Sequence, residues 1–513
     1  MSALDIILVK PGSQRQVYGE LSSFDLTAIE PPLWPALLAG FLRAKGYSVA
    51  VLDAEAENLS PEQTAKAVSD AGPLLAAVVV SGTNPSASTM NMPGAGAIVS
   101  RLRELAPQLK SLLMGLHPSA LPGRTMTEED CDFVCQGEGF ITLPALLDAL
   151  RGKARALAPI DGLWRRQGKA VVSGPRPATL PDLDRLPMPA WDLFPMKAYR
   201  AHNWHCFGDI EHRQPYGLLY TSLGCPYRCN FCCINSLFGK PGIRLRGVDN
   251  VLHEIDYLVE RHGIRHIKII DEMFAVNERR VTTLCDAIAA RGYDLNMWAY
   301  ARVNTVTDRM LESMKRCGIN WVAYGFESGS ERVLKNASKG YDPGSVDAVV
   351  AKTYAHGLNI CANFIFGLPT EDYDSMEQTL ESMLRINAQW ANIYCAMAYP
   401  GSKLYEEALE KNLPLPETWL GYSQYAYETL PLPTGHLSGG QVLAFRDYAF
   451  HAYHANPRYL DMIRRAFGMD AVRHIMRMTE KRLPRLHAEP VEGYALSGSR
   501  DGSSPGPQAM PTD

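Results

Sequence analysis

The chain has 513 residues, more than the roughly 250 to 300 at which a single hydrophobic core stops growing, so two or more domains are expected. Its 46% hydrophobic and 21% charged residues are typical of a globular protein, and 51 Lys and Arg against 55 Asp and Glu leave a net charge of -4. This balance gives no support for general nucleic-acid binding, and a small-molecule substrate fits it better.

The N-terminal sequence MSALDIILVKPG leads directly into a predicted strand and lacks the basic and long apolar regions of a secretory signal. No uninterrupted apolar run suits a bilayer span, so we expect a cytoplasmic protein without stable membrane association. The 11 cysteines are too sparse for a disulfide scaffold. In a reducing compartment, a close group of cysteines indicates metal binding or catalysis.

Residues 1–150 alternate short apolar runs with helical stretches. Continuous apolar strands separated by helices predict a parallel sheet covered on both faces, so the expected fold class is α/β with a Rossmann-like N-terminal domain. The runs lie at residues 6–9, 48–52, 76–80, 111–114 and 133–135.

Small or turn-forming residues follow several of these strands. Open α/β sheets bind ligands outside the carboxyl ends of their strands, where such residues let a large cofactor approach the backbone. The sequence therefore predicts that a ligand binds at this edge of the sheet, although it does not yet identify the ligand. The residues expected there are Ser81, Gly82, Thr83, Gly115, His117, Gly137 and Glu138.

The remaining chain divides into four predicted parts. Residues 151–215 are rich in Pro, Arg and turn-forming residues, which suits an extended connector. Strands and helices alternate again over residues 216–435, which predicts a parallel sheet curled into a full or partial barrel. Residues 436–486 look helical and are expected to pack on the catalytic domain. Residues 487–513 have the composition of a disordered tail.

The most informative segment follows the predicted strand YGLLY. Cys225, Cys229 and Cys232 lie in one short loop with the spacing CxxxCxxC. Three thiolates can bind three irons of a [4Fe-4S] cluster and leave the fourth iron open to another ligand. A structural zinc site usually takes four ligands in paired arrangement, and neither a second CxxC nor a pair of histidines accompanies this loop. A cluster is therefore favoured over zinc or buried thiols.

This pattern, with an aromatic residue before its last cysteine, resembles the radical S-adenosylmethionine (SAM) superfamily. The resemblance implies that Cys225, Cys229 and Cys232 ligate the cluster, that the open iron chelates SAM, and that an electron cleaves SAM to a 5'-deoxyadenosyl radical. Later strand ends resemble the same family in order and spacing. The SAM-binding residues that the resemblance implies are Phe231, Asp271, Glu272, Arg302, Gly325, Glu327 and Ser328.

The N-terminal part resembles the B12-binding domain of certain radical SAM proteins, through Pro31 to Trp34, Gly115 to Pro118 and Gly137 to Gly139. The resemblance covers about residues 1–435 and implies that the predicted ligand edge contacts cobalamin. The DxHxxG loop that supplies a histidine to cobalt in many other B12 proteins is absent. We therefore expect no protein histidine on the cobalt, His117 included.

The resemblance implies a cobalamin-dependent radical SAM methyltransferase, in which one SAM methylates cobalamin and another generates the radical that abstracts a substrate hydrogen. Its expected acceptor is a carbon or phosphorus centre of a small molecule, and its expected electron donor is a flavodoxin or ferredoxin. Two alternatives stay open: a radical cyclase or rearrangement enzyme without net methylation, and a non-catalytic cobalamin-binding sensor. Aromatic residues could line the substrate pocket or belong to the core: Trp191, Tyr199, Trp204, Trp419, Tyr422 and Tyr425.

Overall fold

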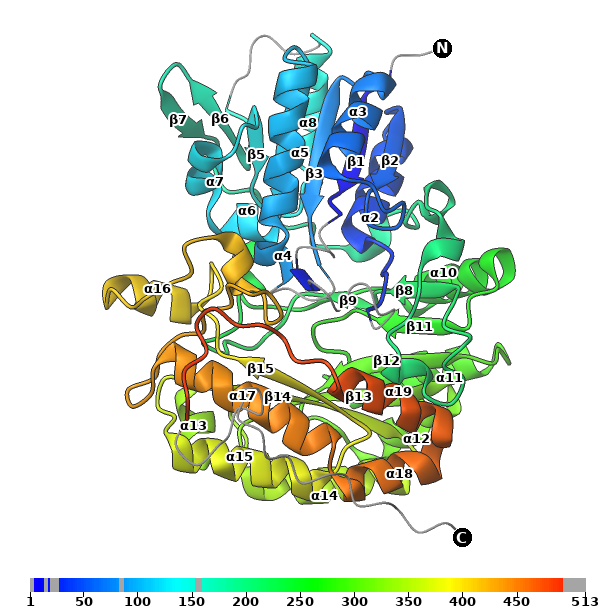
Figure 1. Ribbon diagram of the computed structural model, residues 1–513. Helices are drawn as coiled ribbons and strands as arrows, with labels where there is room; N and C mark the ends of the chain where they lie inside the picture. The colour runs from blue at the N-terminus through cyan, green and yellow to red at the C-terminus, as the bar shows by residue number, and fades with distance from the viewer. Residues whose placement is uncertain (1–3, 13–16, 19–26, 83–86, 153–158, 492–513) are drawn as a thin grey trace.

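The computed structural model describes residues 4–12, 17–18, 27–82, 87–152 and 159–491, arranged as two α/β domains with a helical region at the C-terminal side (Figure 1). Most of the expected tail, residues 492–513, lies outside the described residues. The α/β class, with a Rossmann-like domain before a partial barrel, is confirmed.

The N-terminal sheet has the strand order β2-β1-β3-β4-β5-β6-β7, and its first five strands are parallel. Side chains of β1 alternate between two hydrophobic clusters, one packed against α2 and α8 and the other against α3 and α5, so both faces are covered. The elements are β1 (Ile6–Lys10), α2 (Leu33–Ala44), β2 (Val49–Asp53), α3 (Pro61–Ala71), β3 (Leu75–Val80), α4 (Ala87–Met90), α5 (Met92–Leu105), β4 (Lys110–Gly115), α6 (Leu116–Ala120), α7 (Pro122–Glu128), β5 (Phe133–Cys135) and α8 (Thr142–Leu150).

An antiparallel hairpin, β6 (Leu163–Gln167) and β7 (Ala170–Ser173), extends this sheet beyond β5. The expected connector of residues 151–215 is therefore not wholly extended chain. From Ser173 to β8 it contains only short 3-10 turns, and the backbone of Ile29 and Arg200 pairs in an isolated bridge across it.

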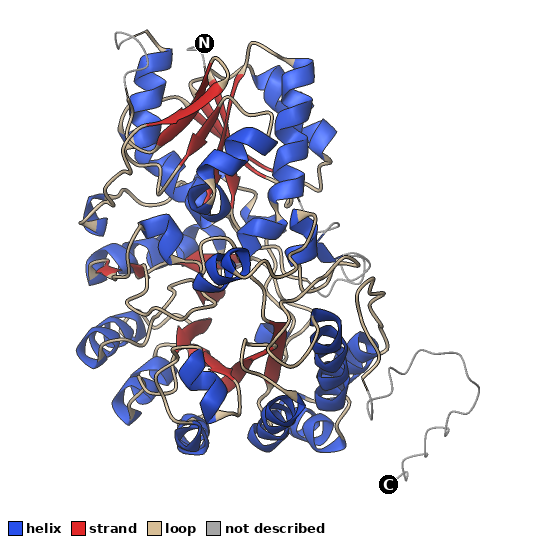
Figure 2. Cartoon of the chain, turned by 90° about the vertical axis from the view of Figure 1, so that its left-hand side faces the viewer, coloured by secondary structure: helices blue, strands red, loops and turns tan. Residues whose placement is uncertain are grey.

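The second sheet has six parallel strands in the order β15-β14-β13-β12-β11-β8. Its edge strands β8 and β15 do not pair, so the sheet is an open partial barrel with helices around its outside (Figure 2). The elements are β8 (Tyr216–Leu219), β9 (Ser222–Leu223), α9 (Asn235–Phe238), β10 (Arg244–Leu245), α10 (Val248–His262), β11 (His266–Ile269), α11 (Glu278–Ala289), β12 (Asn296–Ala301), α12 (Asp308–Arg316), β13 (Ile319–Glu327), α13 (Glu331–Asn336), α14 (Val346–Ala355), β14 (Asn359–Phe366), α15 (Tyr373–Ile386), β15 (Trp390–Cys395) and α16 (Lys403–Glu410).

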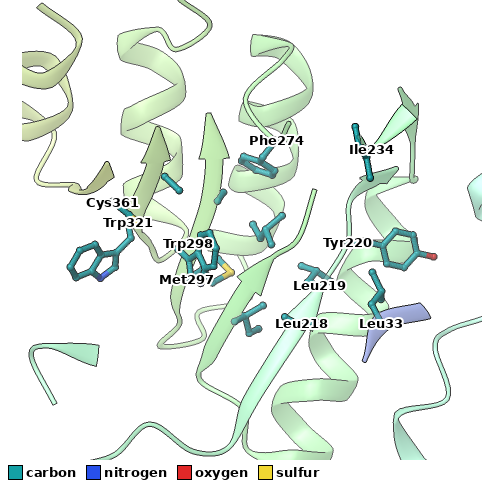
Figure 3. Close-up of a cluster of buried hydrophobic side chains, with 14 of the residues drawn as sticks. Leu33, Leu218, Leu219, Tyr220, Ile234, Phe274, Met297, Trp298, Trp321 and Cys361 are labelled. Atoms are coloured by element: carbon teal, nitrogen blue, oxygen red, sulfur yellow. The ribbon is translucent and has the colours of Figure 1, made fainter. Parts of the chain in front are cut away.

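The main hydrophobic core continues from one domain into the other. Leu33 at the start of α2 belongs to the same buried cluster as Leu218 and Trp298 of the second sheet (Figure 3). Burial of apolar surface across the domain boundary stabilises one fixed arrangement of the two sheets.

Three helices, α17 (Gly439–His454), α18 (Pro457–Phe467) and α19 (Met469–Thr479), form the predicted C-terminal helical region. The Phe467 ring stacks on Trp321 of β13 with centroids 5.8 Å apart, and the Tyr459 hydroxyl donates to the Gln389 carbonyl at 3.1 Å. Apolar residues of α18 and α19 belong to the same buried cluster as Trp321, so both helices pack on the barrel, as expected. None of the described helices is long and apolar enough to cross a membrane.

Candidate active site between the two domains

A cavity of about 1570 Å³ lies between the two sheets. From the N-terminal side it is lined by the ends of β3 and β4 and the loop after β5, and from the other side by the cysteine loop and inward-facing side chains of β11 to β15. The carboxyl ends of both sheets therefore meet at one space, where parallel sheets place their ligands. Because single-ligand pockets measure roughly 300 to 1,000 Å³, this cavity has room for more than one ligand.

The loop after β9 presents three cysteines at this cavity. Cys225, Cys229 and Cys232 are partly exposed, whereas the other eight cysteines are buried. The Cys232 amide donates to the Cys229 carbonyl at 3.1 Å, and the Gly242 amide donates to the Cys225 carbonyl at 3.0 Å, which hold the loop in shape. Burial, with the neighbouring thiols adding to it, raises the pKa of Cys232 to about 12.

Crowded, partly exposed thiols beside a cavity fit a [4Fe-4S] cluster, whose irons bind them as thiolates. In the described part of the chain, no three His, Cys, Asp or Glu side chains lie close enough to share one metal ion. A cluster does not require this proximity, because each cysteine binds a different iron. Cys225 and Cys232 line the cavity directly.

Two adjacent carboxylates after β11 have different roles. Asp271 accepts hydrogen bonds from the Thr221 amide, the Thr221 hydroxyl and the Ser222 hydroxyl, each at 2.6 Å, so it fixes the start of the cysteine loop. Glu272 accepts from the Gly224 amide at 3.0 Å and lines the cavity. Burial raises the pKa of Glu272 to about 7. Of this pair, only Glu272 is placed to contact a ligand.

Arg302 lies beside the cysteine loop, not on the cavity wall. Its Nη1 is 3.6 Å from the Cys229 sulfur, and its guanidinium lies 3.8 Å from the centre of the Tyr227 ring. It also donates to the Lys339 carbonyl. A cation and a donor at a cluster ligand favour the more negative, reduced cluster.

Glu327 lines the cavity from the end of β13 and is paired with Lys339. Glycine at position 325 leaves room for this pair, since a Cβ there would lie too close to the Glu327 carboxylate and the Lys339 ammonium in their present positions. The Lys339 ammonium lies 5.8 Å from the centre of the Phe231 ring, and Phe231 also lines the cavity. Ser328, in contrast, is buried and bonds to Thr379 at 3.0 Å.

The opposite edge of the cavity is formed by glycine-rich strand ends. Ser81, Gly82, Gly115 and Gly137 all line it, whereas Thr83 lies outside the described residues. Gly115 has φ +128, and a Cβ there would collide with the Val80 carbonyl. Only glycine therefore fits at the end of β4.

Ser119 joins two of these strand ends. Its hydroxyl donates to the Gly115 carbonyl at 2.6 Å and accepts from the Gly137 amide at 2.9 Å. The exposed backbone edge is thereby held as a rigid platform. Glycines at the strand ends let the broad face of a corrin ring approach the backbone, so this edge is suited to cobalamin.

The His117 side chain is turned away from this platform. Its Nδ1 is 3.1 Å from the Thr89 hydroxyl, and its ring contacts the Trp419 ring edge-on at 4.5 Å. The residue is 1% exposed and does not line the cavity. Burial lowers the pKa of the imidazole to about 3.

We therefore expect that His117→Ala leaves the cobalt spectrum unchanged. Electron paramagnetic resonance of the bound Co(II) state reports a nitrogen ligand as hyperfine splitting. Because the imidazole is directed into the protein, the wild type and the variant should show the same spectrum. Nitrogen splitting that is present in the wild type and lost in the variant would contradict this placement.

Glu138 is engaged by the other domain, although it lines the cavity. Its carboxylate accepts two hydrogen bonds from Arg244 of β10, at 2.5 and 3.1 Å, and a third from the Leu180 amide at 3.1 Å. This largely buried, bidentate pair joins the two domains. These contacts hold the two walls of the cavity together.

Sequence reasoning missed a second buried ion pair between the domains. Glu30, just before α2, lies 3.1 Å from the Lys268 ammonium of β11, and His202 is 3.2 Å from the same carboxylate. Burial opposes ionisation of Glu30, yet Lys268 and His202 lower its pKa to about 2. A lysine flanked on both sides by isoleucine in IRHIKII is the one sequence signal that could have indicated it.

Four polar side chains of the barrel interior also line the cavity and had no recognisable motif: Tyr300, Asn363, Asn392 and Tyr394. Of the aromatic candidates, Trp204 and Tyr425 reach the cavity, whereas the other four do not. The SAM-binding and cobalamin-binding roles implied by resemblance stay predictions. The structure shows which of those residues line the cavity: Phe231, Glu272, Glu327, Ser81, Gly82, Gly115, Gly137 and Glu138.

Comparison with known proteins agrees with this two-domain site. The B12 binding domain family matches residues 25–147, and the Radical SAM superfamily matches residues 219–383. The uncharacterized methyltransferase PH0819 of Pyrococcus horikoshii is 30% identical over 466 residues, which are 90% of this chain and 94% of the relative.

Two more distant proteins are similar over most of the chain. The anaerobic magnesium-protoporphyrin IX monomethyl ester cyclase of Rubrivivax gelatinosus is 23% identical over 389 residues, 74% of this chain and 67% of the relative. The structure of the radical SAM methyltransferase TsrM from Kitasatospora setae, with cobalamin and a [4Fe-4S] cluster bound, aligns with a TM-score of 0.67 at 17% identity. That alignment covers 94% of this chain and 99% of the other, so the two share a fold.

Proposed function

The chain belongs to the cobalamin-dependent radical SAM enzymes, and we propose that it methylates a carbon or phosphorus centre of a small molecule. The observation that carries the proposal is the single cavity that reaches both the cysteine loop and the glycine-rich platform. Two cofactors can act on one substrate only if one space contains them all.

When bound, the cluster, SAM and cobalamin supply a carbon radical and a transferable methyl group. The chain's own residues hold and orient these groups. Cys225, Cys229 and Cys232 are the cluster ligands, and Gly115 and Gly137 let the corrin approach the backbone. Glu272 and Glu327 face the same space and provide oxygen acceptors for the SAM amino group. The buried walls confine the reactive groups and limit side reactions.

We further propose that the electron comes from a reduced flavodoxin or ferredoxin and that the reaction takes place in the cytoplasm. Support comes from the cysteines, which are free throughout the chain. Cysteines that ligate a cluster must stay reduced, which requires a reducing compartment.

A radical ring closure without net methylation is a second candidate, and the similarity to the monomethyl ester cyclase favours it. Methyltransfer is preferred because the relative with higher identity and wider coverage carries a methyltransferase name. A cobalamin-binding sensor is a third candidate, which the shared cavity does not favour.

Product analysis separates these functions. Anaerobically reconstituted protein is incubated with SAM carrying an isotopically labelled methyl group, a reductant and candidate substrates, followed by mass spectrometry. We expect the labelled methyl in the product together with 5'-deoxyadenosine. Product formation without label would establish the cyclase or rearrangement function. Protein that contains a complete cluster but never cleaves SAM would instead support the sensor function.

A further inference from the structure

One wall of the cavity comes from outside both matched domain families. It is formed by α17 and by the segment that follows α19. We call it the cationic wall, because four of its side chains are basic and one is acidic. Its charged members are Arg446, Asp447, Lys481, Arg482 and Arg485.

Asp447 cannot neutralise this wall. It accepts hydrogen bonds from Arg446 Nη1 at 2.6 Å and from Arg485 Nε and Nη2 at 2.9 and 3.0 Å. Both arginine side chains are almost fully buried, at 5% and 4% exposure. One carboxylate therefore faces two buried guanidinium groups. A buried charge in excess of its partners is costly unless another charge compensates it.

Some N–H donors of the cationic wall have no hydrogen-bond acceptor among the described residues. Arg446 uses Nε on the Ile393 carbonyl at 2.8 Å and Nη1 on Asp447, while its Nη2 has no partner among the described residues. Arg482 also makes no hydrogen bond or ion pair in the described part of the chain and lines the cavity. Burial lowers the pKa of Arg482, against the opposing effect of Asp447.

His451 adds a neutral polar group to the same wall. Burial, and then the charges of Arg482 and Arg446, lower its pKa to about 4, so the imidazole is uncharged near neutral pH. A neutral imidazole carries one N–H group and can therefore donate one hydrogen bond without being charged. The wall thus offers guanidinium and imidazole donors along one side of the cavity.

The wall and the cysteine loop lie at opposite edges of the barrel in strand order. Arg446 bonds to Ile393 of β15, the last strand of the sheet, whereas the cysteine loop follows β8 at the other edge. The aromatic rings of Tyr425 and Phe450 lie 5.6 and 5.8 Å from the Arg446 guanidinium. A ligand held here would have its charged end at the wall and its apolar part toward the barrel.

We propose that the cationic wall binds an oxyanion of the substrate, a carboxylate or a phosphoryl group, and that the substrate class is an anionic small molecule. Guanidinium groups recognise both anions through paired N–H donors. This inference rests on the proposed function, since it assigns one side of the same cavity to the substrate. Substrate methylation would then take place at an atom some distance from the anionic group.

The test measures inorganic phosphate binding to the enzyme loaded with cluster and cobalamin, by equilibrium dialysis at fixed chloride concentration. Wild type should bind one phosphate per chain. Arg482→Gln should weaken binding about tenfold or more, because it removes a charged donor. Arg477→Gln, an exposed arginine of α19 that does not line the cavity, is the matched control and should bind like wild type.

Acetate added as competitor distinguishes the two anions. Displacement of phosphate by acetate at similar concentration indicates a carboxylate site, and resistance to acetate indicates a phosphoryl site. Binding that is absent in the loaded wild type, or equal in Arg482→Gln and wild type, would overturn the inference. Arg446→Lys, which keeps the charge but loses the guanidinium geometry, gives an independent second variant.

This binding measurement does not depend on turnover, so the two proposals fail separately. If phosphate binding does not depend on the cationic wall, the assignment of an anionic substrate is wrong even if methylation is observed. Wall-dependent phosphate binding in an enzyme whose product lacks the labelled methyl would remove the methyltransferase function and leave an anion-binding radical enzyme.

Discussion

Replacing Cys225, Cys229 and Cys232 together by alanine is expected to abolish both cluster assembly and SAM cleavage. These three thiols are the partly exposed cysteines of the chain, and they share one loop at the cavity. Without them no iron has a protein ligand, and an electron cannot reach SAM. Iron and sulfide analysis, visible absorbance and chromatography of 5'-deoxyadenosine measure the loss.

Cys233→Ala is the matched control. Cys233 is adjacent to the loop's last cysteine and is buried, outside the CxxxCxxC spacing. It should retain iron content and SAM cleavage close to wild type. Retention of full cluster absorbance in the triple variant, or its loss in Cys233→Ala, would show that the cluster ligands have been assigned wrongly.

A second large effect is expected from Lys268→Met, which should lower the free energy of unfolding by about 3 to 5 kcal/mol. The substitution removes the ammonium partner of the buried Glu30 carboxylate and leaves His202 beside it. Chemical denaturation followed by circular dichroism measures the change. Lys66→Met, which removes an exposed partner of Asp70, is the control and should change stability by no more than about 1 kcal/mol.

Adding Glu30→Gln to Lys268→Met should recover much of the lost stability, because a neutral amide is cheaper to bury than an unpaired carboxylate. The wild-type pair should also be sensitive to acid. Since the pKa of Glu30 is lowered from its ordinary value of 4.5 to about 2, its stabilisation is present above pH 4.5 and is lost as pH falls toward 2. Equal stability of the single and double variants would mean that the pair is not buried in solution.

Local pattern was sufficient to predict the parallel strands but not the edge hairpin. Runs such as residues 76–80 are buried on both faces, so every position is apolar and the strand is visible in the sequence. β6 and β7 lie at the end of the sheet and are largely exposed. LWRRQ carries two charges, and neither it nor AVVS shows a clear alternation. Strand pairing at an edge depends on the neighbouring strand, which the local sequence does not encode.

The three proposed cluster ligands could be recognised in the sequence because their spacing within one loop relates them. The positions of the other site residues depend on the direction of each side chain and on contacts between residues that are far apart in the sequence. Asp271 and Glu272 are neighbours in sequence, yet only the second reaches the cavity. Glu30 and Lys268 are 238 residues apart, and no local pattern relates them. The side chain of His117 is turned away by contacts with Thr89 and Trp419, which only the folded chain brings together.

The cationic wall is encoded after the two matched domains, so it can change in evolution separately from them. Its residues follow the last matched domain, which ends at residue 383, and they contact β15 without entering the cysteine loop or the glycine-rich platform. Mutations in this late segment can therefore alter which molecules are accepted while the machinery that generates the radical is inherited unchanged. Natural selection could explore new substrates here through a short stretch of coding sequence, and descendants of one ancestor could differ in metabolism while sharing a single reaction centre.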